Sequence, residues 1–244
     1  MTDRGYCVVL GASGGIGEAI ARHLGANGWS LYIHYNANLA NALRLQKELQ
    51  VMYPQSDFKL VQADFSVIDG AEILAKQVRH VGAIVIANGQ SMLKLLTDTS
   101  LTDMDALWKV HVQNPAHFIS IVSSQLRRFK KSYVVFIGSI WGSTGAAGEV
   151  MYSTVKGAQH AFVKAYAKEA AYSGVRVNAI APGWIETRMN SEISIEDQKM
   201  VIDAIPLMST GTPAHIADAV SFLLSGQADY MTGEVMNING GWYI

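Results

Sequence analysis

The feature that most constrains this chain is a glycine-rich run placed directly after a short apolar segment. The segment "YCVVL" (6–10) is followed at once by "GASGGIG" (11–17), whose glycines form the pattern G-x-x-x-G-x-G. A buried strand, a tight glycine turn and a helix start are the context of a dinucleotide site, because glycine permits close backbone approach and the helix N-terminus attracts a pyrophosphate. An ordinary turn is the alternative, but the strand–loop–helix context favours dinucleotide binding. We expect the nucleotide to contact Gly11, Ser13, Gly14, Gly15, Ile16 and Gly17.

Short apolar segments alternate with longer helical patterns along the whole chain. Strands are expected at 6–10, 31–35, 58–62, 83–87, 133–137, 175–180 and 235–238. Helices are expected at 15–27, 38–52, 67–79, 102–126, 150–173 and 212–225. Several strands are apolar at consecutive positions, as in strands that are covered on both faces, and the alternation predicts a parallel sheet. We therefore expect one α/β domain over residues 1–244, in which the strandless segment 183–212 could carry a substrate lid.

The composition excludes several classes of function. The chain has 19 basic and 20 acidic residues, a formal net charge of −1, so it offers no broad attraction to nucleic acid or to anionic membranes. Its single cysteine, Cys7, makes no internal disulfide, which favours a reducing compartment. No apolar run has the length of a membrane span or of a signal peptide. We expect a cytoplasmic protein.

The end of the second expected strand indicates which dinucleotide binds. NAD sites commonly place an acidic residue there to hold the ribose 2′-hydroxyl. This strand ends in "HYNAN", and no Asp or Glu occurs between Glu18 and Glu48. A 2′-phosphate would meet no repulsion, and its candidate partners are Asn36, Asn38 and Arg44. The sequence therefore favours NADPH (NADP+) over NADH.

A second stretch holds three residue types suited to carbonyl reduction. Tyr152 and Lys156 lie one helical turn apart, so they share a face, and Ser139 ends the fifth expected strand. A ketone that accepts hydride develops negative charge on oxygen, so it needs a proton donor and a hydrogen-bond donor. We expect Tyr152 to donate the proton and Ser139 to orient the carbonyl. The Lys156 ammonium and a positively charged nicotinamide nearby would lower the pKa of Tyr152, and Lys156 would also bind the nicotinamide ribose. A lone Y-x-x-x-K arises on many helices by chance, but its combination with the glycine loop and the serine favours catalysis.

With these motifs the chain resembles the classical short-chain dehydrogenase/reductase family over almost its whole length. The segments "GASGGIG", "VRVNAIAPG" (175–183) and "MTGEVMNINGGW" (231–242) also fall in the family's order. The resemblance implies a single-domain Rossmann fold, with a seven-stranded parallel sheet and helices on both faces, often assembled as a homotetramer or homodimer. It also implies cofactor contacts from Asp64, Phe65, Asn88, Gly89, Pro182, Gly183, Ile185 and Thr187, in addition to Tyr152 and Lys156.

Within the family the chain is similar to two kinds of ketone reductase. It is similar to bacterial 3-oxoacyl-acyl-carrier-protein reductases. More narrowly, "GSIWGSTGAAGEVMYSTVKGAQHAFVK" (138–164) and "HYN" resemble the elongation factor P 5-aminopentanone reductases. The resemblance implies a ketone carried on elongation factor P or on acyl carrier protein. A non-catalytic nucleotide-binding regulator is the alternative of another class, and the intact Ser139, Tyr152 and Lys156 argue against it.

Three positions depart from the family pattern. Leu10 stands where a threonine is usual, Asn88 takes the place of an alanine in "IANG", and His111 replaces an asparagine. The resemblance implies that the main-chain carbonyl of the residue at position 111 holds a water, which connects Lys156 to solvent.

Pro115 gives an independent reason to expect a free carbonyl at His111. A helical residue donates its N–H to the carbonyl four residues earlier, and proline has no N–H while its ring crowds that same carbonyl. Four residues before Pro115 is His111. We expect His111 to contribute its carbonyl oxygen to catalysis, whereas its side chain could join a proton relay or be structural.

Residues near the expected strand ends are candidates for the substrate wall, although such residues are as often ordinary core. The candidates are Ser91, Trp141, Trp184 and Met189. The basic run "RRFKK" (127–131) is expected near the active site, where it could dock an acidic carrier protein or form a solvated helix end. Carrier-protein reductases usually have a second basic residue just before Gly174, where this chain has Ser173. Because only one of the two basic positions matches, the sequence supports an acyl-carrier-protein substrate less strongly.

Overall fold

The computed structural model describes residues 4–187 and 194–244, and it contains the expected seven-stranded parallel sheet. The strand order is β3-β2-β1-β4-β5-β6-β7, so the order reverses between β1 and β4. In doubly wound sheets, ligands bind at such a reversal, outside the carboxyl ends of the strands. The strands are β1 (Tyr6–Leu10), β2 (Ser30–Tyr35), β3 (Phe58–Gln62), β4 (Val81–Ile86), β5 (Ser132–Ile137), β6 (Val175–Pro182) and β7 (Val235–Ile238).

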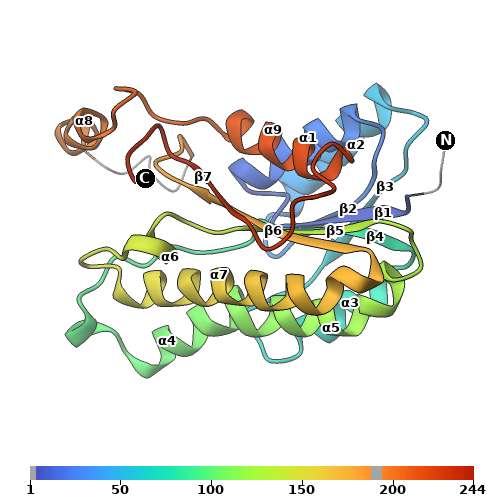
Figure 1. Ribbon diagram of the computed structural model, residues 1–244, viewed down its shortest axis with the longest axis horizontal. Coiled ribbons are helices and arrows are strands. Elements are labelled where there is room, and N and C mark those ends of the chain that lie inside the picture. The colour runs from blue at the N-terminus through green and yellow to red at the C-terminus, as the bar shows by residue number, and fades with distance from the viewer. Residues whose placement is uncertain (1–3, 188–193) are drawn as a thin grey trace.

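Helices cover both faces of the sheet, which confirms the predicted Rossmann fold (Figure 1). One face carries α1 (Gly15–Ala26), α2 (Leu39–Met52) and α9 (Pro213–Leu224). The other carries α3 (Gly70–Gln77), α4 (Leu101–Trp108), α5 (Asn114–Leu126) and α7 (Val150–Ala170). The shorter elements are η1 (Leu96–Asp98), η2 (Lys109–Gln113), α6 (Trp141–Thr144) and η3 (Ala171–Ser173). No helix of the described residues is long and apolar enough to cross a membrane.

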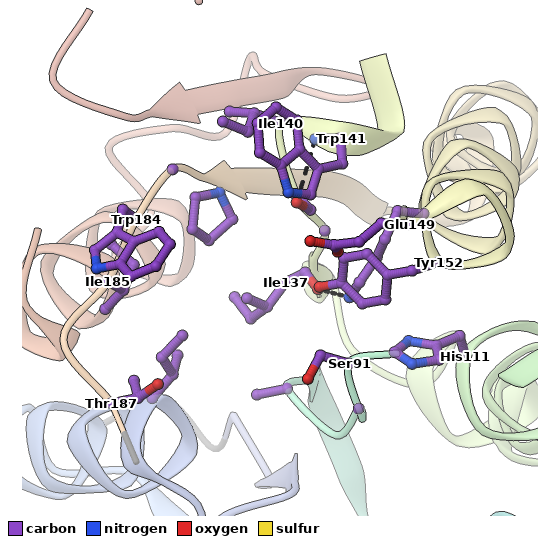
Figure 2. Close-up of a pocket in the computed structure, with 18 of the residues that line it drawn as sticks. Ser91, His111, Ile137, Ile140, Trp141, Glu149, Tyr152, Trp184, Ile185 and Thr187 are labelled. Carbon is purple, nitrogen blue, oxygen red and sulfur yellow. Dashed lines mark hydrogen bonds between the residues drawn. The ribbon is translucent and has the colours of Figure 1, made fainter. Parts of the chain in front are cut away.

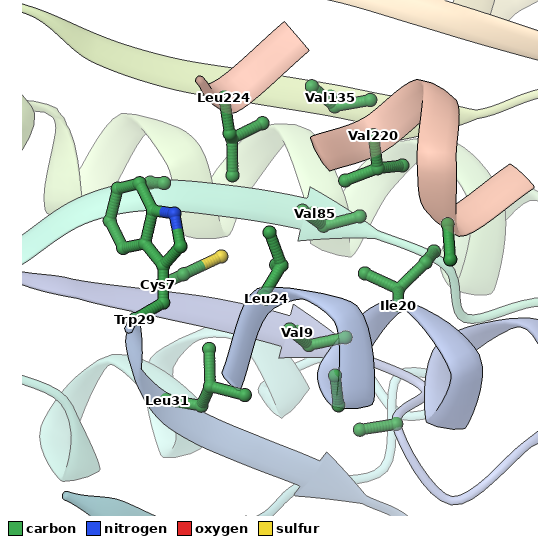
Figure 3. Packing of buried hydrophobic residues seen from close by; sticks show 14 of the residues in the cluster. Cys7, Val9, Ile20, Leu24, Trp29, Leu31, Val85, Val135, Val220 and Leu224 are labelled. Carbon is green, nitrogen blue, oxygen red and sulfur yellow. The ribbon is translucent and has the colours of Figure 1, made fainter. Parts of the chain in front are cut away.

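The core explains why the strands are apolar at consecutive positions. Each central strand has a helical layer on either side, so alternate side chains are buried on opposite faces. Each fully buried aliphatic side chain contributes about 1.5–3 kcal/mol. Figure 3 shows the layer under α1 and α9, where the packed side chains include Val9, Ile20, Leu24, Val85, Val135, Val220 and Leu224. Cys7 is buried in the same layer, and this burial raises the pKa of its thiol, which therefore stays protonated.

The helix expected over 102–126 is divided into three pieces, α4, the π-helical η2 and α5. Pro115 lies in the first turn of α5, and its missing N–H leaves the carbonyl four residues earlier without an α-helical donor. The turn before it is widened, because the N–H of Asn114 reaches the carbonyl of Lys109. The proline thus lies where the helix changes from the π-helical η2 to the α-helical α5.

The segment 183–212 also differs from the sequence expectation. Its described residues contain no strand, as expected, but they include a helix that was not expected, α8 (Ile195–Ala204), and a bridge between Ile185 and Gly211. Ser194 caps the first turn of this helix by accepting the N–H of Asp197 at 3.1 Å.

Candidate active site

Two connected cavities open at the carboxyl ends of the central strands. The nucleotide cavity lies beside the glycine loop, and the reaction cavity lies between the ends of β4, β5 and β6 and the start of α7. They form one crevice because they share the lining residues Ile16, Ala87, Asn88, Gly89, Gln90 and Thr187. The crevice lies where the strand order reverses, as expected for a Rossmann sheet.

The nucleotide cavity is lined by the residues that the sequence and the resemblance indicate. Gly11 has a φ of +72°, and a Cβ there would come within 2.7 Å of the Cα of Asn88. Only glycine fits this position without strain. The other predicted contacts that line the cavity are Ser13, Gly14, Gly15, Ile16, Gly17, Asn36, Asp64, Phe65, Asn88 and Gly89.

His34, which sequence reasoning did not select, supports the glycine loop from β2. The N–H of Gly11 donates to His34 Nδ1 at 3.0 Å, and the opposite ring nitrogen lies 3.1 Å from the carbonyl oxygen of Ala63. Because Nδ1 accepts, Nε2 carries the proton and donates to Ala63. Burial lowers the pKa of His34 to about 4, so the ring is neutral at neutral pH and can act as this acceptor.

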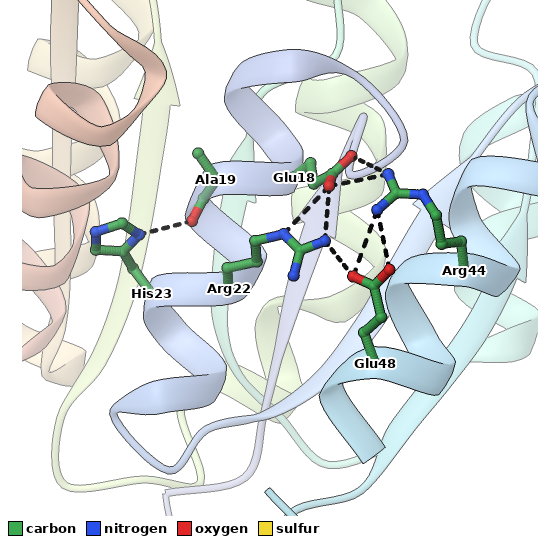
Figure 4. A network of polar contacts seen from close by, with 6 residues as sticks. All are labelled: Glu18, Ala19, Arg22, His23, Arg44 and Glu48. Carbon is green, nitrogen blue, oxygen red and sulfur yellow. Dashed lines mark hydrogen bonds and ion pairs between the residues drawn. The ribbon is translucent and has the colours of Figure 1, made fainter. Parts of the chain in front are cut away.

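Of the three candidates for a 2′-phosphate, Asn36 alone lines the nucleotide cavity. The side chain of Asn38 caps α2. Arg44 lies between Glu18 and Glu48, at 2.8 Å from a Glu18 oxygen and 3.2 Å from a Glu48 oxygen (Figure 4). Its guanidinium therefore links α1 with α2 in this structure.

The three predicted catalytic side chains all line the reaction cavity, in which Figure 2 shows Tyr152. Ser139 follows β5, and its Oγ accepts the N–H of Trp141 at 3.2 Å. Tyr152 and Lys156 lie in the first turns of α7. The buried Lys156 ammonium donates to the carbonyl oxygen of Ile137 at 2.9 Å and lies 5.5 Å from the centre of the Tyr152 ring.

The chain's own groups shift the pKa of Tyr152 in the direction opposite to our expectation. Burial, followed by the nearby Glu149 carboxylate, raises it to about 12, although a hydrogen bond with Ser139 acts in the opposite direction. Burial also lowers the pKa of Lys156, to about 7. Tyr152 is therefore a neutral phenol, the form that can donate a proton.

The ring of His111 is a packed, neutral group. It is fully buried, with Nε2 3.0 Å from the carbonyl oxygen of Gln90 and the ring edge-on to Tyr152 at 5.7 Å between centres. Burial, followed by the charge of Lys156, lowers the pKa of His111 to about 3. A Cβ at Gly89 would come within 2.7 Å of the ring. This environment favours a supporting role for the ring under the 89–90 loop.

The carbonyl of His111 has a partner that the sequence did not suggest. Pro115 has no N–H, so the α-helical hydrogen bond to this oxygen cannot form. The Nε2 of Gln159, on α7, donates to it at 2.7 Å. A carbonyl oxygen has two lone pairs, so a water could still bind at this carbonyl, which stays a prediction.

Most of the other predicted cofactor and substrate residues line the reaction cavity. The cofactor residues Pro182, Gly183, Ile185 and Thr187 and the substrate residues Ser91, Trp141 and Trp184 line the reaction cavity. Met189 lies outside the described residues. The basic run 127–131 was expected near the active site, but it precedes β5, whereas the cavity opens at the carboxyl end of that strand. The run therefore lies away from the site, and this expectation was wrong. Sequence reasoning missed the lining residues Gln90, Ile137, Ile140, Glu149 and Trp242.

Asn88 departs from the family pattern and has a definite role in the fold. Its Nδ2 donates to the carbonyl oxygen of Val110 at 2.9 Å, which ties the end of β4 to the widened η2 turn. Asn114 makes a similar link, because its buried side chain donates to Phe65 at 2.9 Å and to Val67 at 2.7 Å. The loop that carries Asp64 and Phe65 is therefore fixed to the start of α5.

Comparison with known proteins agrees with this arrangement. A family described as enoyl-(acyl carrier protein) reductase matches residues 11–243. The uncharacterized oxidoreductase YmfI of Bacillus subtilis (strain 168) is 41% identical over 97% of this chain and 98% of its own length. The 3-oxoacyl-[acyl-carrier-protein] reductase FabG of Aquifex aeolicus (strain VF5) is 32% identical over 97% of this chain and 96% of its own.

Two solved structures have the same fold over nearly the whole chain. A short-chain dehydrogenase/reductase from Brucella melitensis superposes with a TM-score of 0.88 at 27% identity, covering 99% of this chain and 98% of that one. A blue fluorescent protein from a metagenomic library, in complex with NADPH, superposes with a TM-score of 0.92 at 25% identity, covering 98% of each chain. With matches of this extent, and with the serine, tyrosine and lysine meeting in one cavity, this chain belongs to the short-chain dehydrogenase/reductase family of oxidoreductases.

Proposed function

We propose that this protein is an NADPH-dependent reductase that converts a ketone into a secondary alcohol. The observation that carries the proposal is that Ser139, Tyr152 and Lys156 line a cavity that is continuous with the nucleotide cavity. A dinucleotide in this crevice would extend from the glycine loop to the catalytic tyrosine. When bound, NADPH supplies the hydride that reduces the carbonyl carbon.

The chain's own residues account for the rest of the reaction. Ser139 donates a hydrogen bond to the carbonyl oxygen, and the neutral phenol of Tyr152 gives that oxygen its proton as negative charge develops there. Lys156 binds the ribose and stabilises the phenolate that remains, since an opposite charge nearby favours the ionised form. The phenolate regains a proton through Lys156 and a water on the His111 carbonyl.

Two observations support NADPH as the hydride donor. No carboxylate follows β2, where one would repel a 2′-phosphate, and Asn36 lines the cavity there instead. A relative of the same fold was solved in complex with NADPH.

The proposed substrate is the 5-aminopentanone group on elongation factor P. The resemblance of residues 138–164 and of "HYN" to reductases of that group supports this choice. The alternative is a 3-oxoacyl chain on acyl carrier protein, which the similarity to the Aquifex aeolicus reductase supports. Against the alternative, the basic run 127–131 lies away from the cavity, and its Lys131 already pairs with Asp229.

We further propose that residues 183–212, with α8, cover the bound substrate, since Trp184, Ile185 and Thr187 already line the cavity. We also propose that the protein is cytoplasmic and acts as a homodimer or homotetramer, which sedimentation of the purified protein would test.

The substrate proposal is tested by following NADPH oxidation with ketone-modified elongation factor P and, in parallel, with an acetoacetyl thioester of acyl carrier protein. We expect the larger kcat/KM with elongation factor P. A larger kcat/KM with the acyl carrier would establish the alternative substrate. A non-catalytic regulator would oxidise NADPH with neither, and its cellular function would survive Tyr152→Phe.

A further inference from the structure

Glu149 places an acidic side chain in the reaction cavity beside the catalytic tyrosine. It occupies the N-cap of α7, yet its side chain makes no capping hydrogen bond. Figure 2 shows its carboxylate next to the hydroxyl of Tyr152, in the open space of the cavity. The side chain is only half-buried, so a ligand can reach it.

No cation of the described part of the chain pairs with this carboxylate. Lys94 bridges to Glu149 through its main chain, but its ammonium pairs with Asp103 at 2.8 Å. The ammonium of Lys156 donates to the carbonyl of Ile137. Among residues 4–187 and 194–244, Glu149 thus has no cationic partner in this partly dehydrated cavity.

A carboxylate at position 149 destabilises the folded protein when no ligand is bound. Removing a carboxylate from water without a partner costs free energy, and burial accordingly raises the pKa of Glu149. The same negative charge raises the pKa of Tyr152. The dipole at the N-terminus of α7 offsets part of this free-energy cost. A glutamine would fill the same space without any charge to bury. A positively charged ligand group would offset the remainder.

The walls of the cavity fit such a group. Three indoles line it, from Trp141, Trp184 and Trp242, and the rings of Trp141 and Trp242 lie 5.3 Å apart in an edge-on arrangement. The faces of indole rings attract ammonium groups through their negative electrostatic potential, and desolvation strengthens this attraction. A carboxylate together with several indoles is therefore suited to hold an alkylammonium group.

We propose that Glu149, together with these indoles, binds a cationic amine of the substrate, so that the enzyme selects ketones that carry an alkylammonium group a few carbons from the carbonyl. The inference rests on the proposed ketone reduction and deepens it. A 5-aminopentanone group contains such an amine, whereas a 3-oxoacyl thioester has none near its ketone.

Three matched methyl ketones test this charge preference. The first carries a trimethylammonium group three carbons from the carbonyl, the second its neutral tert-butyl isostere, and the third a carboxylate at the same distance. The readout is kcat/KM for each ketone with NADPH. For the unmodified enzyme we expect the order ammonium, then neutral, then carboxylate.

Glu149→Gln removes the charge and keeps the shape of the side chain. We expect the ratio of kcat/KM for the ammonium ketone over its neutral isostere to fall by about tenfold, equivalent to about 1.4 kcal/mol, mainly through KM. Glu72→Gln is the matched control, because Glu72 is an exposed acid in the first turn of α3, outside the cavity. It should leave the ratio unchanged.

The outcomes separate this inference from the proposed reaction. Equal reduction of all three ketones, with no change in Glu149→Gln, overturns the cation site and leaves the reductase standing. If no ketone is reduced, the reductase proposal fails, and the cation site is then tested by measuring the dissociation constant of each ketone from the NADP+ complex. Tighter binding of the ammonium ketone that is lost in Glu149→Gln supports the site. Equal or undetectable binding of all three overturns the site.

Discussion

The side-chain amide of Gln159 donates a hydrogen bond of 2.7 Å to the main-chain carbonyl of His111, which precedes it by 48 residues. The contact joins α7, which carries the catalytic tyrosine and lysine, to the widened turn before Pro115. It occupies an oxygen whose helical partner the proline removes. Gln159 therefore supplies a donor to a buried acceptor that has no α-helical donor.

Replacing Gln159 tests how much this contact stabilises the fold. In Gln159→Met the carbonyl loses its donor, and we expect the free energy of unfolding to fall by about 1–3 kcal/mol. In Gln159→Glu the new carboxylate faces the carbonyl oxygen of His111, and two acceptors cannot form a hydrogen bond unless the acid is protonated. The loss in free energy of unfolding should therefore grow as the acid ionises, between about pH 5 and about pH 8. Urea titrations at several pH values measure both. Equal, pH-independent stabilities of the two variants would contradict the proposed geometry.

Substitution of His111 separates the role of its ring from that of its backbone. If the carbonyl carries the function, His111→Asn should keep turnover within about tenfold, or 1.4 kcal/mol in activation free energy. The reason is that the ring is neutral and packs under the 89–90 loop, while the oxygen belongs to the main chain. The measurement is kcat with saturating NADPH. A much larger loss would assign a catalytic role to the imidazole.

The phenol of Tyr152 is predicted to be the proton donor. We expect Tyr152→Phe to lower kcat/KM by about 10²–10⁴-fold and to leave the NADPH dissociation constant nearly unchanged, since proton transfer is lost but the cavity is kept. Tyr166→Phe is a matched control on the same helix, because that hydroxyl is buried without a hydrogen-bond partner in the described structure. If both variants reduce ketone equally well, Tyr152 is not the donor.

Burial of Lys156 predicts a pH dependence of stability. Its pKa falls from 10.5 in the unfolded chain to about 7 in the folded protein. Between these values the unfolded state binds more protons, so stability should rise with pH, by up to about 1.4 kcal/mol per unit. Below about pH 7 the full penalty of the buried ammonium is present.

Lys156→Met isolates this contribution, because it removes the charge and keeps a long side chain. We expect the variant to be inactive but more stable than the unmodified protein at neutral pH, with the difference shrinking as the pH rises. Thermal unfolding at a series of pH values, without NADPH, measures this difference. A constant difference would show that Lys156 has the same pKa in both states.

The cofactor preference is predicted to depend on Asn36. Asn36→Asp places a carboxylate in the nucleotide cavity, so the KM for NADPH should rise by tenfold or more, about 1.4 kcal/mol, with little effect on the KM for NADH. Asn38→Asp adds the same charge where the side chain caps α2, a role that aspartate also performs. It should change the NADPH-to-NADH ratio far less. Equal effects of the two substitutions would indicate a long-range charge effect instead of contact with a 2′-phosphate.

Local sequence patterns were enough to predict the parallel α/β fold and the candidate catalytic side chains. Glycine sterics at Gly11, the apolar runs of the buried strands and the helical spacing of Tyr152 and Lys156 are local properties, so neighbouring residues suffice to reveal them. The same local logic located the irregular turn before Pro115, because proline lacks the N–H that the helix needs.

The tertiary structure alone decided which distant side chains share the site. His34 accepts from the glycine loop, Gln159 donates to His111, and Trp242 from the C-terminal segment joins Glu149 in the reaction cavity. No periodicity or spacing encodes these pairs, since each depends on how layers of the fold pack together. The direction of the Tyr152 pKa shift was missed for the same reason: it follows from burial and from the Glu149 charge, which exist only once the chain has folded.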